Sequence, residues 1–129
     1  MIVTPIYAAL CGLLLILLSY RVILQRKRLD VALGDDGEPR IRRAMRVQAN
    51  FVEYAPVALI LLALAELQGH AFWLLHGLGL LLVGGRLLHA FGVAREPENF
   101  RFRVAGMTLT FSAIAIASLA NLAGVLILW

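Results

Sequence analysis

The chain has a single cysteine and little charge, and these two shortages limit what it can be. Cys11 has no second cysteine with which to form an intrachain disulfide. Charged residues make up 16% of the 129 positions and hydrophobic residues 61%, compared with roughly 45–50% apolar residues in soluble domains. The three histidines are scattered and lie apart from Cys11, so no metal site is expected. The composition therefore predicts an integral membrane protein without a bound metal.

Four apolar stretches are long enough to cross a bilayer, which takes about 20 residues. They cover about residues 1–20, 47–67, 71–93 and 103–129. A basic cluster follows the first stretch and no positive charge precedes it, the reverse of a cleaved signal peptide, so this stretch is expected to remain as a helix. Residues 34–39 have the composition of a turn or mobile loop, and Trp129 suits the membrane interface. The predicted fold is a single all-α domain over residues 1–129, an integral membrane four-helix bundle.

The basic residues indicate how the bundle is oriented. The connection between the first two spans, with its helix ends, and the connection between the last two spans carry all 12 of them. The remaining connection and both termini carry none, so the positive-inside rule places both basic connections in the cytosol and both termini outside. Because these residues flank apolar spans, they do not form the basic stripe of a nucleic-acid-binding surface. Membrane lipid is an expected partner and nucleic acid is not.

Small residues recur along the last two spans. Ala113, Ala117 and Asn121 are spaced four residues apart in the fourth span, and the third span contains Gly84 and Gly85. Such positions let helix backbones approach closely in lipid, where burial of apolar surface gives no driving force. The pattern is more typical of packing within one bundle, and the alternative is an interface between subunits.

A polar stripe enters the membrane on the second span. Its members are Arg43, Arg46, Asn50 and Glu53. At about 100° per residue this spacing confines them to an arc of roughly 80°, from the cytosolic interface to about two turns into the bilayer. Four other polar residues approach the same interface from the other spans, namely Arg21, Arg86, His89 and Arg103. We expect a basic, partly buried cavity at the cytosolic end of the bundle.

Two interpretations of this cavity remain open. Arg46 and Glu53 could pair with each other or with Arg86 to hold the bundle, while Arg43 and Arg21 reach the headgroups. Alternatively, the cavity binds a small anionic zwitterion, because arginines grip carboxylates and a buried acid can take an ammonium group. Ionisable groups inside a span are costly, which makes them candidates for function.

The run from residue 43 to residue 56, RAMRVQANFVEYAP, resembles the second-helix signature of the MAPEG family, the membrane-associated proteins in eicosanoid and glutathione metabolism. The pattern is Arg-x-x-x-Asn-x-x-Glu-Tyr-x-Pro. GRLLHA at residues 85–90 and RVAG at residues 103–106 extend the likeness over the whole chain. The resemblance implies a homotrimer of four-helix subunits that binds glutathione as co-substrate between neighbouring subunits near the cytosolic face.

The resemblance also implies roles for individual residues. Those implied in glutathione binding are Arg21, Arg43, Arg46, Gln48, Asn50, Glu53, Tyr54, Arg86 and His89. Arg103 matches the family's catalytic arginine, which activates the thiol of glutathione. A free thiol has a pKa of about 8.5, and a fixed cation beside it favours the nucleophilic thiolate. The thiolate would then attack a hydrophobic small-molecule electrophile drawn from the lipid.

Two departures from the family pattern argue against an eicosanoid-specific reaction. His89 stands where the eicosanoid enzymes carry a glutathione-contacting tyrosine, and Val22 replaces a second arginine in the first span. The main hypothesis is therefore a general glutathione-dependent membrane transferase or peroxidase. The alternatives are a non-catalytic scaffold that binds lipid or glutathione, as the five-lipoxygenase-activating protein of this family binds lipid, and a small four-helix transporter. The short connections suggest a bacterial inner-membrane protein.

Overall fold

The structure is a computed structural model that describes residues 1–128, so the interfacial position expected for Trp129 lies outside the described residues. The chain forms four helices, α1 (Val3–Leu29), α2 (Pro39–Leu67), α3 (Phe72–Ala94) and α4 (Phe100–Leu128). All four are long and apolar enough to cross a membrane. In lipid a helix satisfies its own backbone hydrogen bonds, which is why apolar runs of this length fold as helices. The predicted all-α, four-helix membrane fold is confirmed.

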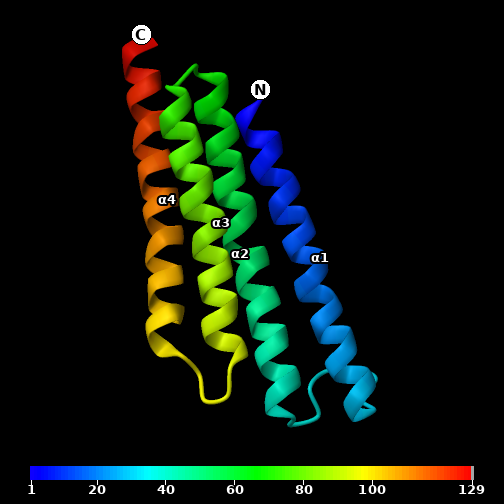
Figure 1. Cartoon of the computed structure of the whole chain (residues 1–129). Coiled ribbons are helices and arrows are strands. Elements are labelled where there is room, and N and C mark those ends of the chain that lie inside the picture. Colours follow the sequence, from blue (N-terminus) through cyan, green and yellow to red (C-terminus); the bar gives the residue numbers. More distant parts are fainter. Residues whose placement is uncertain (129) are drawn as a thin grey trace.

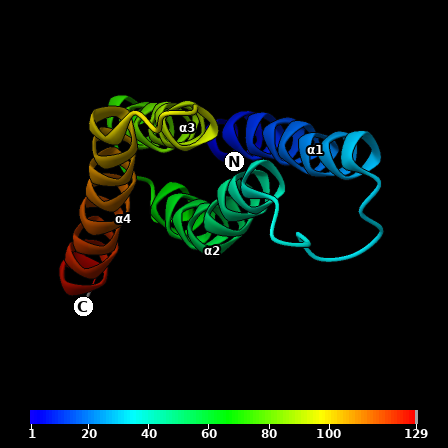
Figure 2. The same ribbon diagram turned by 90° about the horizontal axis from the view of Figure 1, so that it is seen from below.

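The helices run side by side, with the two chain termini and the α2–α3 turn at one end of the bundle (Figure 1). The α1–α2 and α3–α4 connections lie at the other end, which we call the basic end. Seen along the bundle, α3 lies between α1 and α4, and α2 packs against one side of the row that these three helices form (Figure 2). The connections that carry the basic residues therefore lie at the same end of the bundle.

The helices are longer at the basic end than the apolar runs. α1 continues past residue 20 to Leu29, with Arg26, Lys27 and Arg28 in its last turn, where cations interact favourably with the negative end of the helix dipole. α2 begins at Pro39 instead of residue 47, and proline is favoured at the first position of a helix. The predicted turn is present between these ends, with positive φ at Gly34 and Gly37. Hydropathy therefore indicates which residues lie in the hydrocarbon, but not where the helices begin and end.

Two glycines bring the backbones of α3 and α4 together. A Cβ at Gly106 would lie 2.6 Å from the carbonyl oxygen of Gly85 and 2.8 Å from the Cα atom of His89. Ala113 and Ala117 are likewise buried within the subunit. Gly84, in contrast, faces open space, with nothing within 4 Å of a Cβ built there. The small residues thus serve packing inside one subunit at most of these positions, but not at all of them.

At the end away from the basic loops, Glu66 of α2 holds the start of α1. Its carboxylate accepts hydrogen bonds from the backbone amides of Ile2, Val3 (2.8 Å) and Thr4 (2.7 Å). The first amides of a helix have no partner within the helix, so an acid from another helix can cap them. Tyr7, one turn further along α1, bonds to His76 of α3 with its hydroxyl 2.9 Å from Nδ1. α1 is therefore anchored far from the basic end.

Candidate functional site

A polar pocket of about 200 Å³ opens at the basic end between α2, α3 and the start of α4. It is lined by Arg42, Arg43, Arg46, Asn50, His89, Val93, Glu98 and Arg103. Arg43, Arg46 and Asn50 come from the stripe on α2, His89 comes from the buried side of α3, and Arg103 lies in the first turn of α4. Five of the residues expected at the site therefore meet around one cavity in a single subunit.

Arg86 lies behind this pocket and is only 1% exposed. Its Nε atom donates to Oγ1 of Thr110 at 2.9 Å, and its Nη1 atom donates to Oδ1 of Asn50 at 2.6 Å. Its Nη2 atom lies 3.1 Å from the sulfur of Met107, and its guanidinium stands 5.7 Å from the centre of the Tyr54 ring. Arg86 thus connects α3 to both α2 and α4, and it leaves a buried positive charge next to the pocket.

The ion-pair interpretation of the stripe does not hold within one subunit. Among the described residues, no ion pair includes Arg46, Glu53 or Arg86. Glu53 is exposed on the outer face of α2, within the apolar part of the helix. A charged group that faced hydrocarbon there would be costly, which makes Glu53 a candidate for function.

Asn50 presents a donor to the pocket. An arginine has only donors, so the Asn50 oxygen must face Arg86 and the amide nitrogen is left for another acceptor. This nitrogen has no hydrogen-bond partner among residues 1–128. Asn50 is therefore oriented by the buried arginine in a way that suits binding of an anion.

Two acidic residues at the site, Glu96 and Glu98, lie in the connection between α3 and α4 and were not among the residues expected from the sequence. Glu98 accepts from Nη1 of Arg103 at 2.7 Å and from Nη1 of Arg43 at 3.4 Å. The hydrogen bond from Arg103 and the charges of both arginines hold the pKa of Glu98 below its usual value. Glu96 lies 3.4 Å from Nε of Arg43. Carboxylates of the same chain therefore already pair with Arg43 and Arg103, whereas Arg46 has no ion pair among residues 1–128.

A local signal for this arrangement exists in the sequence. Asn99 accepts a hydrogen bond from the amide of Phe102 at 3.2 Å, as a residue just before a helix commonly does. If Asn99 is taken as the N-cap, the sequence predicts that α4 begins at Phe100. Glu98 is then expected to lie close to Arg103.

The remaining expected residues lie outside this pocket. Tyr54 is half-buried and packs edge-on against Phe111 of α4, with 5.4 Å between the ring centres. Gln48 faces α1 and donates to the hydroxyl of Ser19 at 2.8 Å. Arg21 lines a second pocket, of about 210 Å³, on the side of α1. Within one subunit, Gln48 is therefore turned away from the stripe on α2, and Arg21 shares a pocket with only one member of the stripe, Arg43.

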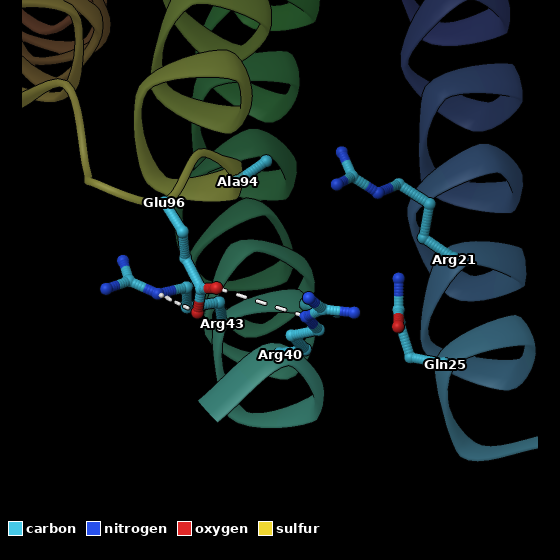
Figure 3. Close-up of a pocket in the computed structure, with 7 residues that line it drawn as sticks. Arg21, Gln25, Arg40, Arg43, Ala94 and Glu96 are labelled. Atoms are coloured by element: carbon cyan, nitrogen blue, oxygen red, sulfur yellow. Dashed lines mark ion pairs between the residues drawn. The ribbon is translucent and has the colours of Figure 1, made fainter. Parts of the chain in front are cut away.

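Figure 3 shows this second pocket at the basic end. Arg21 and Gln25 project from α1 towards α2, where Arg40 and Arg43 are both paired with Glu96. Arg43 lines both pockets, so the two cavities are neighbours that share one arginine.

Comparison with known proteins identifies the family. The model of the MAPEG family matches residues 4–123. The chain belongs to the MAPEG family. Two MAPEG relatives are the inner membrane protein YecN of Escherichia coli K12 and that of Escherichia coli O6:H1 strain CFT073. Each is 38% identical over 120 residues, which cover 93% of this chain and 90% of the relative. Family membership and the four apolar helices together identify this MAPEG protein as an integral membrane protein.

The pocket of this MAPEG subunit can bind an anion with several charges. Arg43, Arg46 and Arg103 provide forked donors at its wall, Asn50 provides an amide donor, and Arg86 adds positive charge from behind. Planar guanidinium groups can bind carboxylates through paired hydrogen bonds, and Arg103 already donates one hydrogen bond to a carboxylate, that of Glu98.

Proposed function

We propose that this MAPEG protein is a glutathione-dependent transferase or peroxidase that acts on hydrophobic electrophiles. The MAPEG family includes glutathione transferases and peroxidases, and the chain belongs to it. The observation that carries the proposal is the pocket in which Arg43, Arg46, Asn50, His89 and Arg103 meet at the basic end of the bundle. Glutathione has two carboxylates, an amine and a thiol, which match a site with several arginines and a nearby acid.

In this mechanism the stripe on α2 binds the charged ends of glutathione and Arg103 faces its sulfur. The thiol loses its proton to water, and the fixed charge of Arg103 stabilises the thiolate that remains. The sulfur then forms a bond to the electrophilic atom of a hydrophobic substrate, and the leaving group departs with its electron pair. Arg103 can perform this role without a change of its own charge, since an arginine stays protonated in proteins.

The pocket of one subunit supports a shared site in a homotrimer. Its volume of about 200 Å³ lies below the roughly 300–1,000 Å³ of most small-molecule sites. Glu53 is exposed within the apolar part of α2, and Gln48 faces the opposite side of the helix, towards α1. We propose that a neighbouring subunit covers the pocket, that Glu53 and Tyr54 contact glutathione from α2, and that Gln48 approaches it from the neighbour.

We also propose that the protein lies in a bacterial inner membrane, with the basic end in the cytosol and the termini outside. The relatives are named inner membrane proteins, and the distribution of basic residues follows the positive-inside rule. Substitution of Cys11 by serine allows single reporter cysteines to be tested. An impermeant maleimide should label Ala71→Cys, in the α2–α3 turn, in intact cells. It should label Ala32→Cys, in the α1–α2 connection, only after the membrane is permeabilised.

The experiment that tests the reaction separates binding from activation of the thiol. Titration of the detergent-purified protein with glutathione should give saturable binding and an ultraviolet signal from the thiolate. S-methylglutathione keeps the carboxylates and the amine but cannot ionise at sulfur, so it should bind without that signal. Glu53→Gln should weaken binding of both ligands at least tenfold, which corresponds to about 1.4 kcal/mol. Absence of glutathione binding in the wild-type protein would refute the proposal.

Arg103→Gln has a matched control in Arg101→Gln. Both arginines lie in the first turn of α4 and both are exposed, but only Arg103 lines the pocket. The thiolate signal should be lost in Arg103→Gln and retained in Arg101→Gln. Equal effects of the two substitutions would indicate that Arg103 does not act on the sulfur.

One observation favours a second candidate, a scaffold that binds glutathione or lipid without turnover. Glu98 neutralises Arg103 at 2.7 Å, so a ligand must displace this carboxylate before the arginine can act on a thiol. Glutathione binding with no thiolate signal at any pH would support the scaffold.

A further inference from the structure

A lipid-facing groove between α1 and α3 leads to the second polar pocket. The groove has a volume of about 630 Å³. Its lining residues are Leu14, Leu17, Leu18, Arg21, Gly84, Leu87, Leu88, Ala90 and Phe91. Every one of these is apolar except Arg21, which stands at the basic end of the groove and also lines the polar pocket. A small cavity lined by Leu18, Arg21 and Ala94, among others, lies between the two spaces. Groove and pocket therefore form one continuous amphipathic surface.

The charges along this surface favour an anion at one end. The second pocket, shown in Figure 3, contains three basic residues, Arg21, Arg40 and Arg43, and a single acid, Glu96. Glu96 pairs with Arg43 at 3.4 Å and with Arg40 at 3.9 Å, whereas Arg21 has no ion pair or hydrogen bond from its side chain among residues 1–128. Arg21, the cation among the lining residues of the groove, is thus the one without a partner, and in Figure 3 the dashed ion pairs join Glu96 to Arg40 and Arg43 but not to Arg21.

We propose that this groove is a binding site for an anionic phospholipid of the surrounding bilayer. One acyl chain lies along the groove between α1 and α3, and the phosphate contacts Arg21 with Arg40 and Gln25 close by. Basic pockets between membrane helices on the cytoplasmic side are known to bind acidic lipid headgroups. Leu14 precedes Arg21 by two turns, which places about 10 Å of apolar wall directly beneath the phosphate position.

The groove is separate from the proposed glutathione pocket, although the second pocket at its basic end shares Arg43 with that pocket. The residues that line the groove come only from α1 and α3, whereas Glu53 is exposed on α2. The inference does not rest on the proposed function, because it needs only the groove and its unpaired arginine. It assigns Arg21 to a phosphate in place of glutathione, and the two assignments predict different results for one substitution.

The test measures lipid selectivity in reconstituted membranes. The protein is placed in phosphatidylcholine vesicles with a trace of acyl-chain spin-labelled phosphatidylglycerol or phosphatidylcholine, and the immobilised fraction is measured by electron paramagnetic resonance. One basic residue contributes enough attraction for a preference of about fivefold for the anionic lipid. Arg21→Gln should reduce this preference to near one.

Arg28→Gln is the matched control for the charge. Arg28 lies at the end of the same helix and is exposed, but it lines neither the groove nor the polar pocket. The preference should survive in Arg28→Gln. If Arg21→Gln and Arg28→Gln reduce it equally, the attraction comes from diffuse surface charge and the proposal is wrong.

A second pair of variants tests the groove without a change of charge. A Cβ at Gly84 or at Gly77 meets nothing within 4 Å, so the two positions are matched in their room for a Cβ. Only Gly84 lines the groove. Gly84→Leu should therefore release about one immobilised phosphatidylglycerol per subunit, and Gly77→Leu should release none. Retention of the lipid in Gly84→Leu would overturn the proposal, as would an Arg21→Gln variant that loses glutathione but keeps its lipid preference.

Discussion

Gly106→Ala is expected to destabilise the bundle at the contact between α3 and α4. A Cβ at this position would lie 2.6 Å from the Gly85 carbonyl oxygen and 2.8 Å from the His89 Cα atom. Both are backbone atoms in the middle of a helix, and they cannot turn away as the end of a flexible side chain can. The two helices must therefore separate by about 0.5–1 Å before the contacts become ordinary ones.

The size of the expected loss in stability of Gly106→Ala follows from the way helices associate in lipid. A gap of about 0.5–1 Å loses about a quarter to a half of the dispersion energy of each contact across it. In a bilayer this packing is a principal source of helix association, because apolar burial gives no driving force. Overpacking costs about 1–3 kcal/mol, while alanine is favoured over glycine inside a helix by about 0.5–1 kcal/mol. The free energy of unfolding should therefore fall by about 1–2 kcal/mol.

The assay is unfolding of the purified protein in mixed micelles, followed by circular dichroism. Gly77→Ala is the control, because a Cβ there meets nothing within 4 Å and only the gain in helix propensity remains. Gly77→Ala should be as stable as the wild-type protein or more so. If Gly106→Ala unfolds with the same free energy as Gly77→Ala, the close backbone contact between α3 and α4 does not exist as described.

Three further predictions concern the polar contacts of the bundle. Glu66→Ala removes the acceptor for the first amides of α1, so it should lower the free energy of unfolding by about 1–2 kcal/mol and speed hydrogen exchange of those amides. Glu98→Gln should make thermal stability less dependent on pH: because Arg103 lowers the pKa of Glu98, their ion pair stabilises the fold above the usual value of 4.5 and is lost as the pH falls below it. Arg86→Met should cost about 1–3 kcal/mol because it leaves the Asn50 oxygen without its partner, and addition of Asn50→Leu should recover much of this loss.

Each of these predictions has a result that would contradict it. Unchanged exchange at the start of α1 in Glu66→Ala would show that another group caps the helix. A melting temperature that falls equally with acid in the wild type and in Glu98→Gln would mean that the ion pair adds nothing to stability. Additive losses in the Arg86→Met, Asn50→Leu double variant, measured in the same unfolding assay, would show that these two side chains act independently.

The membrane fold could be predicted because its signals are local. Each apolar run must be helical in lipid, whatever surrounds it, since only a helix satisfies its own backbone there. The helical period also places Arg43, Arg46 and Asn50 on one face of α2, and the structure shows all three at one pocket. Neither inference needs knowledge of the neighbouring helices.

The ends of the helices and the acidic partners of the site could not be read from hydropathy. α1 and α2 extend beyond the hydrocarbon because charged residues and proline at their ends support helical structure in water. Glu98 meets Arg103 because Asn99 caps α4 and turns the chain back towards the pocket. Mean hydropathy reflects neither the support of helix ends by charged residues and proline nor the capping by Asn99.

The partners across helices depend on rotations that only tertiary packing decides. A residue's face on its own helix follows from its number, but the helix that this face meets depends on how close the backbones come. Gly85 and Gly106 bring α3 against α4, which buries Arg86 beside Thr110 and turns it towards Asn50. The composition of an apolar helix, by contrast, does not indicate how the helix is rotated about its axis in lipid. The spans and the polar stripe therefore followed from the amino-acid order, whereas the tertiary structure decided which arginine is buried and which, like Arg21, faces a groove open to lipid.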